Sequence, residues 1–183
     1  MFLTDRQQAY KTRLDVFSET KASVLGDYLP AKLGMDDGES VIFACLPGDY
    51  SGHLLFFFEN GKAAKVPVQS YATTSNRRKL TGAYSDKAAL TAVFYLTEDT
   101  ELALYTTENR CLLMHTASLQ PKTTRTTQGV AVMTIKPKYR LERVQPAAQS
   151  GITNLSRYRT RTLPAAGALL KAEDSDDKQL ELL

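Results

Sequence analysis

The sequence predicts an all-β domain built from about three hairpin-based blades, and three observations lead to this prediction. Short apolar segments rich in β-branched and aromatic residues recur along the chain at strand length. Gly, Asn, Pro and Asp separate these segments, as expected for turns. Long segments with helical periodicity are absent from the sequence. The 183 residues suffice for one domain with a sizeable core.

The clearest element is the stretch LLFFFENGKAAKVPV, which spans residues 54–68. Leu54–Phe58 is predicted to form an apolar strand that leads into Asn60-Gly61. These two residues suit a two-residue hairpin turn, because both tolerate positive φ. The second strand carries Lys62 and Lys65 just past the turn. The hairpin therefore combines an apolar first strand with a basic second strand.

The hairpin recurs at intervals of about 50 residues. Phe58–Lys65 aligns with Thr107–Met114 at an offset of 49, and with Thr4–Lys11 at an offset of 54. An apolar strand precedes each copy, and a period of this length indicates blades that stack on their neighbours. The predicted boundaries are one domain at 1–170, with repeats at about 1–50, 51–100 and 101–144, a closing segment at 145–170, and an acidic tail at 171–183.

Further strands are expected between the hairpins. Ser40–Leu46 and Leu90–Leu96 are apolar and rich in strand-forming residues. Gly129–Lys136 alternates loosely and is assigned the same place in the third repeat. Ala22–Leu33 is expected to form one or two helical turns that Pro30 interrupts.

The end of the chain differs from the repeats. Gln145–Gly151 is interpreted as a polar linker, Asn154–Arg161 as one more strand, and Leu163–Lys171 as an apolar closing segment. Glu173–Leu183 is interpreted as a disordered tail, with a short terminal strand or helix as the alternative.

The net charge of +3 is unevenly distributed. Residues 1–59 hold 5 basic and 9 acidic residues, whereas residues 60–143 hold 13 and 6. Residues 144–170 hold three arginines and no acid, and residues 171–183 hold 2 basic and 5 acidic residues. A basic middle and an acidic end favour a polyanionic partner, and chance clustering on a solvated surface is the alternative.

Few residues offer enzymatic or metal chemistry. Cys45 and Cys111 lie far apart without metal-ligand spacing, so we interpret them as reduced thiols of a cytoplasmic protein. His53 and His115 have no acid or thiol in a telling pattern, and Asp36–Glu39 does not match an EF-hand loop. No apolar run approaches the ~20 residues of a membrane helix. We therefore predict no catalytic residue, no metal site and no cofactor in this chain.

The recurring parts resemble a known family. An apolar strand, Glu-Asn-Gly, a basic strand, a basic connection and a Gly-Val strand follow one another in LLFFFENGKAAKVPVQSY, LALYTTENRCLLMHTASL and TTRTTQGVAVMTIK. Residues 1–143 are similar to the C-terminal domain of the A subunits of bacterial type IIA topoisomerases, DNA gyrase and topoisomerase IV. The Gln-Arg-Arg-Gly-Gly-Lys-Gly box of gyrase is missing, and the nearest basic stretch, Asn76–Lys79, lacks its glycines. The resemblance is therefore closer to topoisomerase IV.

This resemblance implies a β-pinwheel, a propeller-like disc whose blades exchange strands, here open or with a partial extra blade. It also implies that a basic rim binds and bends double-stranded DNA and presents it to a catalytic core outside this chain. The complete enzyme would be an ATP-dependent isomerase. It would contain the rest of the A subunit and the ATPase B subunit, use ATP and Mg²⁺, and act in the cytoplasm on the bacterial nucleoid.

A DNA-binding surface needs a row of cations rather than one special residue, because each neutralised phosphate releases counterions. The predicted DNA-binding residues are Lys62, Lys65, Arg77, Arg78, Lys79, Arg110, Lys122, Arg125, Lys136, Lys138, Arg140, Arg143, Arg157, Arg159 and Arg161. The last three alternate, so they would share one face of a strand. Their alternative role is that of ordinary surface charges or of the basic face of a protein-interaction module. We also expect the acidic tail to compete with DNA for these cations.

Overall fold

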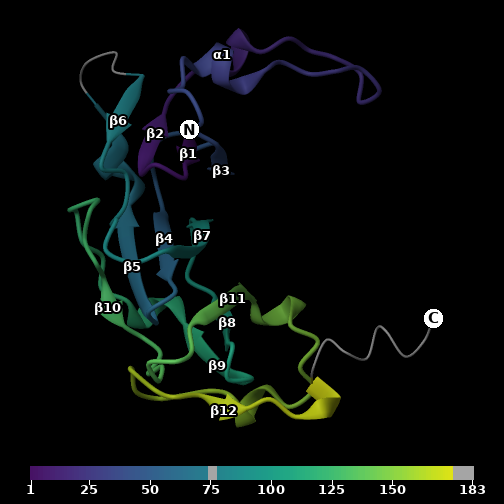
Figure 1. Cartoon of the computed structure of the whole chain (residues 1–183), viewed down its shortest axis with the longest axis vertical. Helices are drawn as coiled ribbons and strands as arrows, with labels where there is room; N and C mark the ends of the chain where they lie inside the picture. The colour runs from purple at the N-terminus through teal and green to yellow at the C-terminus, as the bar shows by residue number, and fades with distance from the viewer. Residues whose placement is uncertain (74–77, 175–183) are drawn as a thin grey trace.

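Each of the three predicted hairpins forms the centre of a four-stranded antiparallel sheet in the computed structural model, which describes residues 1–73 and 78–174 (Figure 1). In sheet 1 the order is β3 (Val41–Ala44), β1 (Phe2–Thr4), β2 (Gln8–Tyr10) and β6 (Lys79–Thr81). In sheet 2 it is β10 (Val130–Ala131), β5 (Lys62–Pro67), β4 (His53–Phe58) and β7 (Leu90–Leu96). In sheet 3 it is β11 (Leu141–Pro146), β8 (Glu101–Thr106), β9 (Arg110–His115) and β12 (Ala168–Leu169).

One edge strand of each sheet is contributed by a later part of the chain. The chain completes the β4–β5 hairpin before β6 returns to sheet 1, and it completes the β8–β9 hairpin before β10 returns to sheet 2. The returning segments also donate to the hairpin turns. Ala83 N donates to Gln7 O (2.8 Å), Val132 N to Gly61 O (2.9 Å) and Leu170 N to Asn109 O (2.9 Å). The exchange of strands that the resemblance implied is thus confirmed.

The hairpin turns have three residues, so the predicted two-residue turn is wrong. Gly61 N donates to Phe58 O (3.0 Å), and Gly61 then takes a φ of 76°. This arrangement is a three-residue hairpin loop that ends in a left-handed residue. Gln7 and Asn109, with φ of 54° and 57°, hold the same place in the other two hairpins. Sheet 3 therefore aligns with sheet 2 at an offset of 48 rather than 49, and Arg110 corresponds to Lys62 instead of Gly61.

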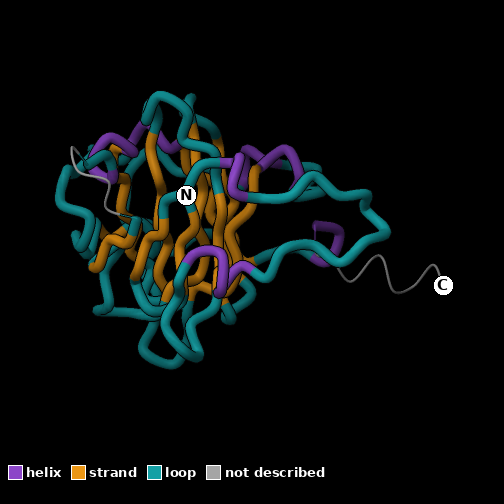
Figure 2. The backbone as a smooth tube through the Cα atoms, turned by 90° about the horizontal axis from the view of Figure 1, so that it is seen from above, coloured by secondary structure: helices purple, strands orange, loops and turns teal. Residues whose placement is uncertain are grey.

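The three sheets follow one another along an open crescent (Figure 1). The strands β6, β10 and β12 are here called the exchanged strands, although β12 returns to sheet 3 from the end segment and not from a further sheet. They lie along the convex side, here called the outer edge, and β3, β7 and β11 lie along the concave inner edge. Sheets 1 and 3 are at opposite ends, so the prediction of an all-β fold with an open disc of about three blades is confirmed. Figure 2 shows the same strands from above, with two loop segments that extend away from them.

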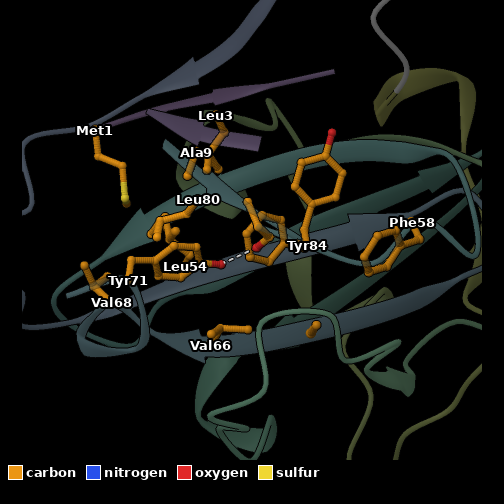
Figure 3. Packing of buried hydrophobic residues seen from close by; sticks show 13 residues of the cluster. Met1, Leu3, Ala9, Leu54, Phe58, Val66, Val68, Tyr71, Leu80 and Tyr84 are labelled. Carbon is orange, nitrogen blue, oxygen red and sulfur yellow. Dashed lines mark hydrogen bonds between the residues drawn. The ribbon is translucent and has the colours of Figure 1, made fainter. Parts of the chain in front are cut away.

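The middle sheet is buried on both faces, which explains the uninterrupted apolar run in β4. Leu54, Phe56 and Phe58 pack with residues of sheet 1, whereas Leu55 and Phe57 pack with residues of sheet 3. Successive strand residues point to opposite faces, so both sets must be apolar when both faces are covered. Figure 3 shows the first of these cores, in which the rings of Phe56 and Tyr84 stack with centroids 5.5 Å apart.

The two terminal sheets are covered by irregular segments instead of further sheets. Over sheet 1, the connection between β2 and β3 contains the 3-10 segment η1 (Leu14–Val16) and the helix α1 (Leu29–Leu33). In this connection the ring of Phe17 packs on that of Phe2 of β1, with the ring centroids 5.9 Å apart. Over sheet 3, the segment after β11 buries Ala147, Ile152 and Tyr158. It contains η4 (Ala147–Gln149), η5 (Leu155–Arg157) and η6 (Ala172–Asp174). End segments of this kind cap stacked repeats.

Several predictions about the connections are wrong. Gly129–Lys136 holds only the two-residue strand β10, and the inner strand of sheet 3 is β11, which overlaps the predicted linker Gln145–Gly151. Asn154–Arg161 is not a strand, because its residues 155–157 form η5. Helix α1 begins at Leu29 and holds Pro30 in its first turn rather than being interrupted there, since proline suits the first turn of a helix.

The part of the predicted acidic tail that the structure describes, residues 171–174, ends at Asp174, which belongs to the cap on sheet 3. It is 4% exposed, and its carboxylate accepts hydrogen bonds from Thr153 N (2.9 Å), Thr153 Oγ1 (2.9 Å) and Tyr158 OH (2.8 Å). The rest of the predicted tail, residues 175–183, lies outside the described residues.

Truncation after Asp174 and truncation before it should therefore have different effects. Deleting residues 172–183 leaves the buried Tyr158 hydroxyl and the Thr153 amide without their acceptor, at a cost of about 1–3 kcal/mol. Deleting residues 175–183 keeps these bonds, so thermal unfolding should start at a higher temperature than in the longer deletion. Equal melting temperatures for the two truncations would show that Asp174 does not anchor the cap. Only the shorter deletion is suited to testing competition between the tail and DNA.

Candidate nucleic-acid interface

Exposed cations accompany each exchanged strand of the outer edge. Arg78 directly precedes β6 and is exposed. Lys62 begins β5, where it pairs with Ala131 of β10, and its Nζ lies 3.4 Å from Gln128 Oε1. The exposed Lys122 lies in the connection to β10, and the exposed Arg161 lies in the connection to β12. Each of the three outer strands thus has basic residues in it or in the segments next to it, although the strands come from different repeats.

A second group of cations lies where the hairpin turns of sheets 2 and 3 meet. Lys136, Lys138 and Arg140 are exposed and belong to the connection from β10 to β11. Backbone bonds hold this connection against both turns. Leu141 N donates to Glu59 O (2.8 Å), and Thr107 N donates to Arg140 O (3.0 Å). Lys136 also forms an ion pair with Glu108, so Lys138 and Arg140 are the more available of the three.

Three of the predicted cations are used inside the protein. Lys65 is 6% exposed, and its Nζ lies 2.6 Å from Asp99 Oδ1. The Arg125 guanidinium donates to Ser70 O (3.0 Å), Gly82 O (3.3 Å) and Thr81 O (3.4 Å), and it lies over the Tyr71 ring. Arg110 donates from Nη1 to Gly167 O (2.9 Å) and pairs with Glu108. We therefore leave these residues out of the proposed DNA surface.

The remaining predicted cations are paired or stacked at the surface. Lys79 pairs with Asp36 (2.6 Å), Arg159 pairs with Glu101 through two bonds of 2.6 and 2.9 Å, and the Arg143 guanidinium lies 4.3 Å from the centroid of the Tyr105 ring. Arg157 is exposed and lies over the Tyr158 ring. Because η5 replaces the predicted strand, the strand face that Arg157, Arg159 and Arg161 were expected to share does not exist. Arg77 lies outside the described residues.

Sequence reasoning missed Lys11, which occupies in sheet 1 the place that Lys65 occupies in sheet 2. Its Nζ donates to Tyr71 O (3.0 Å) and Thr73 Oγ1 (2.6 Å), and burial lowers its pKa. The offset of 54 between the first two hairpins already aligned the two lysines. The signal was therefore present in the repeat, although neither lysine could be placed inside or outside the core without the fold.

The ion pairs make the stability of the domain sensitive to acid. The pKa values of Asp36, Asp99, Glu101 and Glu108 are lowered, in each case mainly by a hydrogen bond from a cation: Lys79, Lys65, Arg159 and Lys136 respectively. The pKa of Asp174 is lowered mainly by its bond from the Thr153 backbone. A carboxylate with a lowered pKa contributes stability above its unfolded pKa and loses it as the pH falls through the folded value.

We therefore expect the melting temperature to be constant near neutral pH and to fall below about pH 5, where carboxyl groups of the unfolded chain begin to protonate. Differential scanning calorimetry from pH 7 to pH 3 measures this. A melting temperature that stays level over the whole range would contradict a stabilising role for these carboxylates.

Among residues 1–73 and 78–174, no group of three or more His, Cys, Asp or Glu side chains is placed to hold a metal ion. Within the same described residues, no helix has the length and apolar character needed to cross a membrane. The predictions about His53, His115 and Asp36–Glu39 stay predictions from their sequence context.

The solved structures with a similar fold include three C-terminal domains. The C-terminal domain of a DNA topoisomerase IV matches with a TM-score of 0.75 and 19% identity over 94% of this chain and 59% of that one. The C-terminal domain of a DNA gyrase A matches with 0.63 and 13% over 95% and 61%. The E. coli ParC C-terminal domain matches with 0.69 and 14% over 93% and 76%.

The chain has the fold of these C-terminal domains. The resemblance inferred from the sequence is confirmed at the level of the fold, and the match is closer in TM-score to the topoisomerase IV domain than to the gyrase A domain. This chain spans about three fifths of the first two matched domains. No protein-family model and no curated protein sequence matches the chain.

Proposed function

We propose that this chain binds double-stranded DNA along its outer edge without sequence specificity and bends it, as the C-terminal domain of a topoisomerase IV-like A subunit. One observation carries this proposal. Exposed cations accompany all three exchanged strands on the convex side of a crescent with the fold of topoisomerase C-terminal domains. Each sheet would thereby contribute phosphate contacts to one continuous path.

The chemistry of the outer edge suits the DNA backbone rather than the bases. Lysine and arginine neutralise phosphates and release counterions, and such contacts position DNA without reading its sequence. The only α-helix among the described residues, α1, has five residues and is too short for a recognition helix. A duplex that follows a convex edge must curve, so preferences among sequences would arise from DNA deformability.

The catalytic steps of the complete enzyme would take place elsewhere. We propose that this domain presents a DNA segment to the remainder of the A subunit, which would work with an ATPase B subunit and use ATP and Mg²⁺. On this proposal the chain itself is not an enzyme, and the protein acts on the bacterial nucleoid in the cytoplasm.

Fluorescence anisotropy of a labelled duplex, titrated with the protein at several salt concentrations, tests the proposal. We expect binding that is micromolar or tighter at low salt, equal for unrelated sequences, and weakened steeply by salt. Energy transfer between dyes at the two ends of the duplex should rise on binding if the DNA bends. Absence of binding at low salt would overturn the proposal and favour a protein-interaction module with a basic face.

A further inference from the structure

Two lysines at equivalent places connect each sheet to the next one. Lys11 directly follows β2 in sheet 1, and Lys65 lies in β5 of sheet 2 at the offset of 54 that relates the two hairpins. Strand register supports this equivalence, because Phe2 pairs with Tyr10 as Phe56 pairs with Ala64, one residue before the lysine in each case.

Lys65 reaches from sheet 2 into sheet 3. Its Nζ donates to Thr116 O (3.3 Å) in η3 (Thr116–Ser118), the segment that directly follows the hairpin of sheet 3. It also pairs with Asp99 (2.6 Å), which lies between β7 of sheet 2 and β8 of sheet 3. Thr116 Oγ1 donates to the same carboxylate oxygen (2.6 Å). The ammonium group thus bonds to two of the parts of the chain that join the two sheets, the connection from β7 to β8 and the segment that follows β9.

Lys11 makes the corresponding contact between sheets 1 and 2. Its Nζ donates to Tyr71 O (3.0 Å) in η2 (Val68–Tyr71), which directly follows the hairpin of sheet 2. Arg125 strengthens the same junction, since it donates to Ser70 O in η2 and to Thr81 O in β6 of sheet 1. Each junction between sheets is therefore bridged by a cation that donates to the 3-10 segment of the following hairpin.

The third sheet supplies a comparison within the chain. The equivalent place in β9 is held by Leu113, which is buried and donates its amide to Tyr158 O (2.7 Å) of the end segment. No sheet follows sheet 3 in the described residues, and here the lysine is replaced by an apolar residue. This position thus holds a lysine where another sheet follows and a leucine where the end segment covers the sheet.

We propose that Lys11 and Lys65 are positioning residues that fix the angle between successive sheets and so set the curvature of the outer edge. Apolar packing between sheets is not directional, so it alone permits sliding and rotation. Lys65 is buried and Lys11 is half-buried. An ammonium group that is withdrawn from water keeps its hydrogen bonds, because an unsatisfied charge there is unfavourable. This requirement selects one angle. The claim that this curvature affects DNA bending rests on the proposed function. The claim that the two lysines fix the angle between sheets does not.

The matched pair of Lys62 and Lys65, three residues apart in β5, allows a sharp test. Spin labels at residue 37 in the connection between α1 and β3, at residue 130 of sheet 2 and at residue 156 of the end segment report the two junctions, with Cys45 and Cys111 replaced by alanine. Distances are measured on the free protein, so they do not depend on whether it binds DNA. Lys65→Met should shift or broaden the 130–156 distance distribution and leave the 37–130 distribution unchanged. Lys11→Met should do the reverse.

DNA measurements on the same variants separate positioning from contact. Lys62→Met should leave both distances unchanged and lower the slope of log affinity against log salt by about 0.9, the loss of one phosphate contact. Lys65→Met should keep the salt slope and reduce the bend of the bound duplex. Where Lys65→Met fails to fold, Asp99→Asn removes the partner of the same ammonium group and should shift the 130–156 distances in the same way.

Two results would overturn the inference. Either both distance distributions stay unchanged in folded Lys65→Met and Asp99→Asn proteins, or Lys65→Met lowers the salt slope as Lys62→Met does. Failure of the parent protein to bind DNA would overturn the proposed function instead, and the distances would still decide the role of the two lysines.

Discussion

Replacing Lys62, Arg78, Lys122 and Arg161 together by glutamine is expected to weaken DNA binding about a thousandfold near 0.15 M salt. Arg78, Lys122 and Arg161 are exposed and Lys62 is half-exposed. The four accompany the three exchanged strands and make the main contacts in the proposed interface. Each lost phosphate contact reduces the salt slope by about 0.9, so the four together should reduce it by about 3.6. Anisotropy titrations of the same duplex at several salt concentrations measure both quantities.

A matched control removes the same charge from other parts of the surface. Arg13, Lys21, Lys32 and Lys87 are exposed, and none of them lies in or beside an exchanged strand. Their joint replacement by glutamine should leave the salt slope nearly unchanged, since only the weak, screened field of distant charges is altered. If both quadruple variants lose the same affinity, binding depends on net charge alone and the outer edge is not a defined interface.

The second large effect is expected at Gly129, where β10 joins sheet 2. A Cβ atom on Gly129 would lie 2.0 Å from Ala63 O of β5, and the residue has a φ of +70°. Gly129→Ala therefore adds both a backbone clash and a strained conformation, and it should destabilise the domain by about 3 kcal/mol or more. For a protein of this size, that corresponds to a fall in melting temperature of roughly 10 °C.

Gly151 provides the control for this substitution. It has a φ of +66°, but a Cβ atom there would meet nothing within 4 Å. Gly151→Ala should cost only the strain of a left-handed alanine, about 1 kcal/mol. Calorimetry on both variants separates the effect of the backbone clash from that of the strained conformation. A similar fall in melting temperature for both would mean that close packing of the exchanged strand contributes little.

The hairpins and their repetition could be predicted from the sequence. The run Leu54–Phe58 and the turn residues after it are local signals, and the structure has strands where these signals predict them. The exact turn was less accessible. Aligning Glu-Asn with Glu-Asn gave the wrong offset for sheet 3, because the conserved feature is a left-handed residue that can be Gly61, Asn109 or Gln7.

The resemblance implied that strands are exchanged, but the positions of these strands in the sequence could not be predicted, because they depend on tertiary contacts. β10 and β12 have two residues each, which is too short for any periodic pattern. Gly129–Lys136 was consequently assigned to the inner edge, although its first residues form the outer strand of sheet 2 and the inner strand of sheet 3 lies further on in Leu141–Pro146.

The two lysines of β5 show that residue type alone does not predict which lysine is accessible and which is buried. Lys62 is accessible on the outer edge, whereas Lys65 is buried against sheet 3. The apolar run of β4 already indicated that both faces of its hairpin are covered, and Lys65 shares a face with Ala63, which packs toward sheet 3. The sequence pattern was thus compatible with a buried Lys65, but only the fold shows which carbonyl and carboxylate receive its charge.

The most direct test of the proposed interface is a titration of the isotope-labelled protein with a short duplex, followed residue by residue with amide NMR spectra. We expect the largest shift changes at residues beside β6, β10 and β12 and in the connection 136–140, with the inner strands β3, β7 and β11 little affected. Shift changes concentrated on the inner strands, or none at DNA concentrations above micromolar in low salt, would contradict the account.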